Sequence, residues 1–390
     1  MLTNLISYSG FNASQKELPN YLIDFISGND ILFITFEHAS GASTHQNIKR
    51  EPWGFKFLVQ KRGYSLLGVK PKQNDWYRNK DLHQFFQSHE FKQFISRFKK
   101  VFLYGGSMGG YAALAFAEAV PGCTVIALNP QSTLDKKLIP WEKRFKSGQE
   151  QDWQNSFHDG AIGASFAEKA YVVYDPFHNE DKKHIDRLNS QNIIHLKVFL
   201  VGHQIPTWLL QMGILGTLID KIVSNSLTEL DFYKLARTRK SIIRYFLRMA
   251  ESHPQNLAIR RSCANQALTI NSMDRKALKL HCECLFEESK FIDVLVIAEN
   301  ILKLNGIELA FKSYIKIGKP DKAIGLLTQI ILHEKPIPQE LLQLTINLAL
   351  SLNEFEIAEK LLAKAAKTTN NRKIIQLANI IKNAKNTDMR

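Results

Sequence analysis

The first 220 residues alternate short apolar runs with longer amphipathic stretches. Six apolar runs are rich in β-branched and aromatic residues and show no polar alternation, which is typical of strands buried on both faces of a sheet. These runs are Ile31–Phe36, Ser65–Val69, Val101–Tyr104, Thr124–Leu128, Tyr171–Tyr174 and Ile194–Val201. Helical patterns such as Leu82–Phe98 and Tyr111–Ala119 lie between them. Strands that alternate with helices predict an α/β domain with a mostly parallel sheet.

The chain changes character near residues 220 to 228. All but three of its 20 glycines precede residue 220, and the pattern after residue 228 is helical throughout. Glycine suits the tight turns of a strand-rich layer and is disfavoured inside helices. We therefore predict an α/β domain over 1–224 and an all-α domain over 225–390.

The helical part contains related stretches. The segments that begin at Pro320 and Phe355 align with Ala323 opposite Ala358, a spacing of 35 residues. A period near 34 resembles the tetratricopeptide repeat, although the aromatic positions of that repeat are mostly missing. We expect an array of helical hairpins, and such arrays normally bind a protein partner or a neighbouring domain.

Composition narrows the function classes. With 45% hydrophobic and 23% charged residues, the chain is an ordinary globular protein and not a disordered one. The net charge of +14 leans toward the helical part, but no stretch resembles a nucleic-acid-reading module, so we expect no nucleic-acid partner. Four cysteines in 390 residues favour a reducing compartment, and the Cys282-x-Cys284 pair lacks zinc spacing.

The sequence also indicates where in the cell the protein is expected. The N-terminus shows no signal-peptide pattern, and the apolar stretch around Leu209–Ile219 is too short for a transmembrane segment. We expect a cytoplasmic protein that needs neither a metal nor another cofactor.

The segment after Val101–Tyr104 is the most informative one. Gly105-Gly106-Ser107-Met108-Gly109 places G-x-S-x-G between a strand and an alanine-rich helix, which is the context of a nucleophile elbow. The strand and the helix come so close there that the outer positions tolerate little side chain. A phosphate-binding glycine turn is the alternative, but neither nucleotide fingerprint fits the string. We interpret Ser107 as a nucleophile.

A serine nucleophile needs a histidine base that is oriented by a carboxylate. In the chain order Ser, Asp, His, Asp175 follows the strand Tyr171–Tyr174 and His203 follows the strand Ile194–Val201. Both lie at carboxyl ends of strands, where open α/β sheets bind ligands. The alternative acids are Asp135 and Asp159, and the competing histidines are His178, His184 and His195.

Residues of about 30 to 220 resemble the α/β-hydrolase fold. The resemblance makes Ile31–Phe36 the third strand and places Ser107 after the fifth, Asp175 after the seventh and His203 after the eighth. It also implies an oxyanion hole formed by the backbone N–H of Met108 and one from Glu37-His38-Ala39, for which we take Glu37. The lipase-type His-Gly-Gly-Gly run is absent there.

Two further segments are candidates for shaping the pocket. Asn74-Asp-Trp-Tyr-Arg78 offers Trp76 and Tyr77 for stacking on a sugar, or for ordinary packing. The connection of about 131–168 is unusually long and is expected to form a cap. It carries five basic residues that suit an anionic ligand or a solvated surface: Lys136, Lys137, Lys143, Arg144 and Lys146.

These features favour a serine-dependent esterase or O-acyltransferase. The elbow and the Asn-Asp-Trp-Tyr stretch also resemble α/β-hydrolase-like proteins of bacterial surface-polysaccharide clusters, which implies a saccharide substrate. The alternative is a scaffold protein with a degenerate hydrolase domain, in which the helical array supplies the function.

Overall fold

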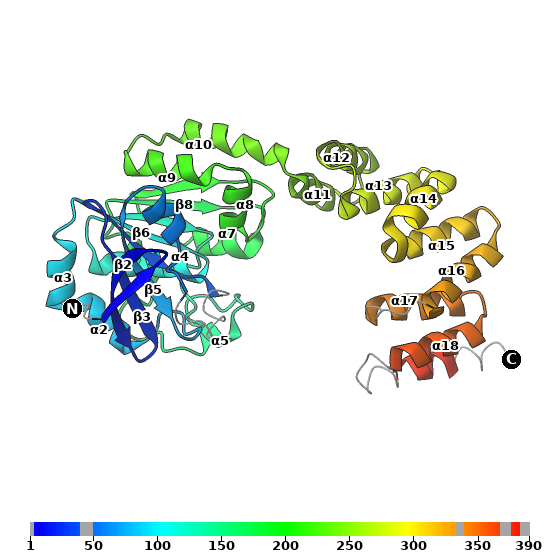
Figure 1. Ribbon diagram of the computed structural model, residues 1–390, viewed down its shortest axis with the longest axis horizontal. Coiled ribbons are helices and arrows are strands. Elements are labelled where there is room, and N and C mark those ends of the chain that lie inside the picture. Colours follow the sequence, from blue (N-terminus) through cyan, green and yellow to red (C-terminus); the bar gives the residue numbers. More distant parts are fainter. Residues whose placement is uncertain (1–3, 40–49, 333–338, 367–375, 383–390) are drawn as a thin grey trace. The chain divides into compact units, whose positions relative to one another are not determined.

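The computed structural model describes residues 4–39, 50–332, 339–366 and 376–382. It divides into two compact units, Met1–Ser241 and Ile242–Arg390. The first unit contains the sheet, and the second is helical (Figure 1). The division lies after the predicted boundary at residue 224, because helix α10 (Glu229–Ala236) belongs to the first unit.

The described part of the first unit forms one nine-stranded sheet in the order β1-β2-β3-β5-β4-β6-β7-β8-β9. The three N-terminal strands are antiparallel, β3 also runs antiparallel to β5, and all later pairs are parallel. The strands are β1 (Asn4–Tyr8), β2 (Phe11–Leu18), β3 (Tyr21–Ile26), β4 (Ile31–Phe36), β5 (Ser65–Pro71), β6 (Lys100–Gly106), β7 (Thr124–Leu128), β8 (Lys169–Tyr174) and β9 (Ile193–Lys197).

This topology confirms the predicted α/β class, with a mostly parallel sheet. Counted from β2, strand β4 is the third, β6 the fifth, β8 the seventh and β9 the eighth, as the resemblance to the α/β-hydrolase fold implied. The strands β1 to β3 were not predicted: β1 and β2 carry polar, partly exposed residues, and the buried apolar run of β3 is interrupted by Asp24.

The central strands are buried on both faces, which explains their unbroken apolar runs. In β4, Ile34 and Phe36 point into one core layer, together with Leu103 of β6. Phe33 points to the opposite side, where its ring stacks on Tyr64 at 5.3 Å. Burial on two sides therefore removes the alternation that a solvent-facing strand would show.

Helices cover both sides of the sheet (Figure 1). The predicted helix Leu82–Phe98 is two helices, because the Ser88 side chain accepts the Phe91 N–H and starts the second one. Within the described part of this unit, the α-helices besides α10 are α2 (Lys80–Gln87), α3 (His89–Ile95), α4 (Met108–Ala115), α5 (Lys146–Gln149), α6 (Gly160–Ala164), α7 (Asn179–Ile185), α8 (Ile205–Gln211) and α9 (Leu215–Val223).

The long connection between β7 and β8, residues 129–168, is mostly irregular and contains only the short helices α5 and α6. Arg78 anchors this connection through hydrogen bonds. The Arg78 guanidinium donates to the backbone carbonyls of Ser156 and Phe157 at 2.9 and 2.7 Å, and Trp153 packs in the main core. Much of the expected cap is therefore part of the domain core.

The second unit packs its helices mainly against their neighbours in sequence around its own apolar core. Ala323 and Ala358, the positions aligned in the sequence, are both fully buried. In its described residues the α-helices include α11 (Ile243–Glu251), α12 (Leu257–Ile270), α13 (Arg275–Glu287), α14 (Phe291–Ile297), α15 (Ile307–Lys316), α16 (Pro320–Leu332), α17 (Gln339–Leu350) and α18 (Phe355–Ala366).

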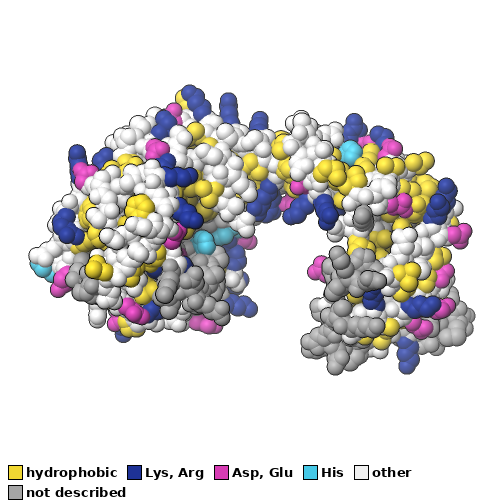
Figure 2. Space-filling model, viewed as in Figure 1, with side chains coloured by type: hydrophobic (Ala, Val, Ile, Leu, Met, Phe, Trp, Pro, Cys, Tyr) yellow, Lys and Arg dark blue, Asp and Glu magenta, His cyan; other side chains and the backbone are white. Residues whose placement is uncertain are grey.

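Lysine and arginine side chains are spread over the visible surfaces of both units, with acidic side chains among them (Figure 2). The described ranges contain no helix that combines the length and the apolar character needed to cross a bilayer.

Candidate active site

The elbow holds Ser107 between β6 and α4 in a strained backbone conformation with a positive φ, at φ 53° and ψ −118°. A Cβ on Gly105 would lie 2.0 Å from the Gly109 carbonyl oxygen, and one on Gly109 would lie 2.2 Å from the Phe36 carbonyl oxygen. Side chains are excluded at both positions because the strand, the helix and the end of β4 touch there. Such strain is found mostly at functional sites.

Ser107 and His203, which the sequence separates by almost a hundred residues, lie in contact. Ser107 Oγ is 3.0 Å from His203 Nε2. His203 Nδ1 is 2.6 Å from Oδ2 of Asp181. An ionised carboxylate only accepts hydrogen bonds, so Nδ1 carries the ring proton and Nε2 is free to accept the serine proton.

The carboxylate that contacts His203 is therefore Asp181 and not Asp175, which was the predicted acid. Asp175 accepts the backbone N–H groups of Val201 and Gly202 at 2.7 and 2.6 Å. It ties down the loop that carries His203. Asp175 stands directly at the end of β8, whereas Asp181 sits one loop later, in the first turn of α7, and reaches the imidazole from there.

Asp181 is fully buried and has a second charged partner. Its Oδ1 accepts from Arg144 Nη1 at 2.8 Å, while its Oδ2 faces His203. Burial alone would raise the pKa of Asp181, but the hydrogen bond from His203 and the neighbouring positive charges lower it below its ordinary value. The carboxylate is thus ionised at neutral pH.

Two buried amide side chains from the turn after β7 also face the pair. Gln131 Oε1 lies 3.3 Å from Ser107 Oγ, and Asn129 Nδ2 lies 3.2 Å from His203 Nε2. Sequence reasoning did not single out either residue. Their position at the carboxyl end of a strand was the available signal.

The end of β4 lies against the elbow and is fixed by Glu37. The buried Glu37 carboxylate pairs with Arg50 at 2.6 Å, and the Glu37 carbonyl accepts the Tyr77 hydroxyl at 2.8 Å. Met108 is the first residue of α4, where backbone N–H groups have no acceptor within the helix. Met108 follows Ser107 directly, and the Glu37 carbonyl oxygen would lie 2.9 Å from a Cβ on Gly109, so both predicted oxyanion residues lie beside the elbow.

Trp76 and Tyr77, the predicted sugar-stacking residues, are 1% and 0% exposed. Trp76 packs on Phe145, with ring centroids 5.0 Å apart, and Tyr77 stacks on Tyr21 at 5.9 Å. This burial corrects the expectation that they line the mouth of a pocket. Both face core aromatic rings, so neither offers a free face to a sugar.

Of the remaining candidate histidines and acids, His178 also contacts Asp181, and the others have different partners. His178 begins α7 and lies 3.4 Å from Asp181, and His195 lies within β9. Asp159 pairs with Arg187. His184 accepts the backbone N–H of Ser132 and lies against Glu142, and Asp135 accepts the Lys137 N–H.

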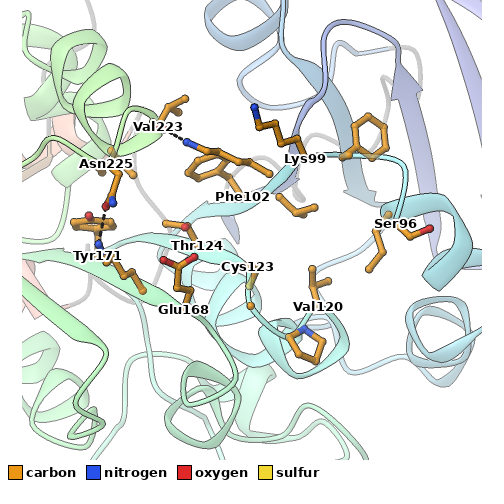
Figure 3. A pocket seen from close by; sticks show the side chains of 18 of the residues that line it. Ser96, Lys99, Phe102, Val120, Cys123, Thr124, Glu168, Tyr171, Val223 and Asn225 are labelled. Atoms are coloured by element: carbon orange, nitrogen blue, oxygen red, sulfur yellow. Dashed lines mark hydrogen bonds between the residues drawn. The ribbon is translucent and has the colours of Figure 1, made fainter.

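A cavity of about 430 Å³ opens at the opposite, amino edge of the sheet (Figure 3). Two of its lysines are engaged, because Lys100 donates to the Val223 carbonyl and Lys169 to Asn225. Because the cavity lies at the amino ends of the strands and Ser107 follows the carboxyl end of β6, the two are separate. Within the described ranges, no cluster of three His, Cys, Asp or Glu side chains is arranged to hold a metal ion.

No protein-family model and no curated protein matches the chain. Among solved structures, the chain is similar to the capsule O-acetyltransferase of Neisseria meningitidis serogroup A, with 17% identity and a TM-score of 0.41 over 56% of this chain and 100% of that one. It is also similar to the fluorophosphonate-binding serine hydrolase F of Staphylococcus aureus, with 12% identity and a TM-score of 0.36 over 57% of this chain and 97% of that one. A third similar structure is the S-formylglutathione hydrolase of Staphylococcus aureus, with 12% identity and a TM-score of 0.34 over 59% of this chain and 100% of that one.

Proposed function

We propose that the protein is a serine-dependent acyl-transfer enzyme in which Ser107, His203 and Asp181 form the catalytic triad. The observation that carries this proposal is the continuous contact from Ser107 Oγ through both ring nitrogens of His203 to the Asp181 carboxylate, at 3.0 and 2.6 Å. A hydroxyl, a base and an orienting acid in this geometry are what nucleophilic acyl transfer requires.

In the first step, Ser107 Oγ attacks the carbonyl carbon of an ester or thioester, and its proton passes to His203 Nε2. The tetrahedral intermediate collapses when the bond to the leaving group breaks, and the leaving oxygen or sulfur takes the proton back from His203. The product of this step is an ester on Ser107. Asp181 stabilises the imidazolium that exists between the two proton transfers.

The developing oxyanion needs donors that are already in place. The Met108 N–H stands at the positive end of α4, and we assign the second donor to the Glu37 N–H, in line with the family resemblance. Glu37 is held on one side by Arg50 and on the other by Tyr77. This support fixes the backbone at which the charge develops.

In the second step, an acceptor gives its proton to His203, and its oxygen attacks the acyl carbon. The bond to Ser107 Oγ breaks, and the serine regains its proton. Water as the acceptor makes the protein an esterase, and a hydroxyl-bearing molecule makes it an O-acyltransferase. The likeness of the elbow to polysaccharide-cluster proteins favours a saccharide hydroxyl.

A fluorophosphonate probe tests the proposal, because it phosphonylates only an activated serine. We expect the wild type to be labelled and Ser107→Ala and His203→Ala not to be. Ser165→Ala, a change at a serine that only bonds the Ile162 carbonyl, serves as the control. A wild type that is folded yet unlabelled would reject the enzyme and favour the scaffold alternative.

The acceptor is tested with p-nitrophenyl acetate. Intact-mass measurement should show one acetyl group on the wild type and none on Ser107→Ala. Added glucose or glycerol then competes with water for this acetyl group. Acetylated sugar identifies a transferase, and free acetate alone identifies an esterase.

A further inference from the structure

A second charged pair stands directly behind Asp181. Arg144 donates to Asp181 Oδ1 through Nη1 at 2.8 Å and to Glu142 Oε2 through Nη2 at 2.7 Å. Glu142 Oε2 in turn lies 3.1 Å from His184 Nε2. Arg144 and Glu142 belong to the connection between β7 and β8, whereas Asp181 and His184 belong to α7.

The charges in this cluster alternate. Burial opposes the ionisation of Glu142, but hydrogen bonds from His184 and Arg144 lower its pKa well below the ordinary value. Burial lowers the pKa of His184, so this imidazole is neutral at neutral pH. Going outward from His203, the sequence of charges is therefore negative at Asp181, positive at Arg144 and negative at Glu142.

This alternation of charges affects the strength of His203 as a base. A lone guanidinium on Asp181 would cancel much of the negative charge that His203 meets, and would make the imidazole harder to protonate. Glu142 cancels the charge of Arg144 in turn. Asp181 and Glu142 are fully buried, where water screens charges poorly, and the guanidinium of Arg144 that bridges them is partly exposed.

We propose that Arg144 and Glu142 are positioning residues that together set the pH range in which His203 acts as a base. Arg144 fixes the Asp181 carboxylate so that Oδ2 faces the imidazole, and Glu142 balances the charge that this fixation introduces. The inference rests on the proposed function, because the pH at which His203 takes up a proton affects catalysis only if His203 is the base.

Other groups near His203 are accounted for. The described titratable and charged groups that face its ring or its loop are Ser107 at the elbow, Asp175 below the loop, Asp181 and His178 on α7 with Glu180 beside His178, and Arg144 with Glu142 behind Asp181. Of these, Glu142 reaches the His203 ring only through Arg144 and Asp181, and Arg144 contacts Asp181 on the oxygen that does not face the ring.

The test compares Glu142→Gln, Arg144→Gln and the double variant. Glutamine at 142 leaves Arg144 unbalanced, so the acid limb of the profile of kcat/KM against pH should move to lower pH by about one unit. Glutamine at 144 leaves two carboxylates unopposed, so the limb should move to higher pH by a similar amount. The double variant should return close to the wild type. Lys137→Gln, which removes an exposed charge from the same connection, should leave the limb in place.

An NMR titration of the His203 Cε1–H, assigned with His203→Gln and His178→Gln, measures the same midpoints without catalysis. Opposite shifts support the inference. Unmoved midpoints, or shifts in one direction for both single variants, overturn it, because a purely structural role lowers the rate without this sign pattern. If Arg144→Gln does not fold, Glu142→Gln alone decides: a midpoint that moves to lower pH supports the inference, and one that stays in place or moves to higher pH overturns it. If the variants show the opposite NMR shifts but the wild type is not labelled by fluorophosphonate, the proposed function is contradicted and the charge balance is not.

Discussion

Asp181→Asn is the change that most sharply separates the two candidate acids. Arg144 only donates hydrogen bonds, so it selects the oxygen of the introduced carboxamide. The amide nitrogen then faces His203 Nδ1 and donates to it. The ring proton must move to Nε2, which lies 3.0 Å from Ser107 Oγ and then no longer accepts the serine proton.

The size of the effect follows from this change of tautomer. An aspartate-to-asparagine change in a serine triad lowers kcat by about 10⁴-fold, which corresponds to about 5 kcal/mol of transition-state stabilisation. Asp175→Asn leaves the contact between His203 and Asp181 in place. It weakens the hold on Val201 and Gly202, so we expect a loss of about 1–3 kcal/mol in the free energy of unfolding and a reactivity within about tenfold of the wild type.

The assay is the second-order rate of fluorophosphonate labelling, measured for both variants at a temperature at which each is folded, with circular dichroism melting as the control for stability. The reasoning is refuted if Asp181→Asn retains more than a tenth of the wild-type rate. It is also refuted if folded Asp175→Asn loses as much reactivity as Asp181→Asn.

Three further outcomes are expected. Gly105→Ala should lower the free energy of unfolding by about 1–3 kcal/mol and slow labelling, since its Cβ would collide with the Gly109 carbonyl; urea unfolding and the probe measure both. Gly325→Ala should stabilise α16 by about 0.5–1 kcal/mol, because nothing lies within 4 Å of the added Cβ, whereas Gly306→Ala, where it would lie 2.8 Å from a backbone atom, should destabilise; equal effects in urea unfolding would contradict this. Burial raises the pKa of Asp75 from 3.8 to about 6, so the native state binds its proton more tightly than the unfolded chain does. The free energy of unfolding of the wild type, relative to Asp75→Asn, should therefore fall by roughly 2 kcal/mol as the pH rises from 4 to 6, and an unchanged difference across this window would argue against it.

Short patterns in the sequence predicted those features of the protein that depend on residues close together in the chain. The glycines around Ser107 mark a close approach of strand and helix, and the structure shows that approach at Gly105 and Gly109. The central strands were also predictable, since burial on both faces leaves unbroken apolar runs. The strands β1 and β2 were not, because strands that are half exposed carry polar residues and resemble a loop.

The pairing of side chains depended on the tertiary structure. The order of residues along the chain predicted that Ser107 and His203 meet at one edge of the sheet. It did not distinguish an acid at the end of β8 from one in the first turn of α7. The distinction is made by the direction of each side chain: Asp175 turns toward the N–H groups of the loop, and Asp181 turns toward the imidazole.

The sequence by itself determined the alternation of strands and helices, the elbow and the residues available for chemistry, because these follow from local sterics and from the period of the apolar pattern. Only the tertiary structure decided which carboxylate meets His203, that Trp76 and Tyr77 lie in the core, and that Arg144 and Glu142 stand behind Asp181. Those contacts join segments that are far apart in the chain, and their strength depends on distance and burial, which no local pattern encodes.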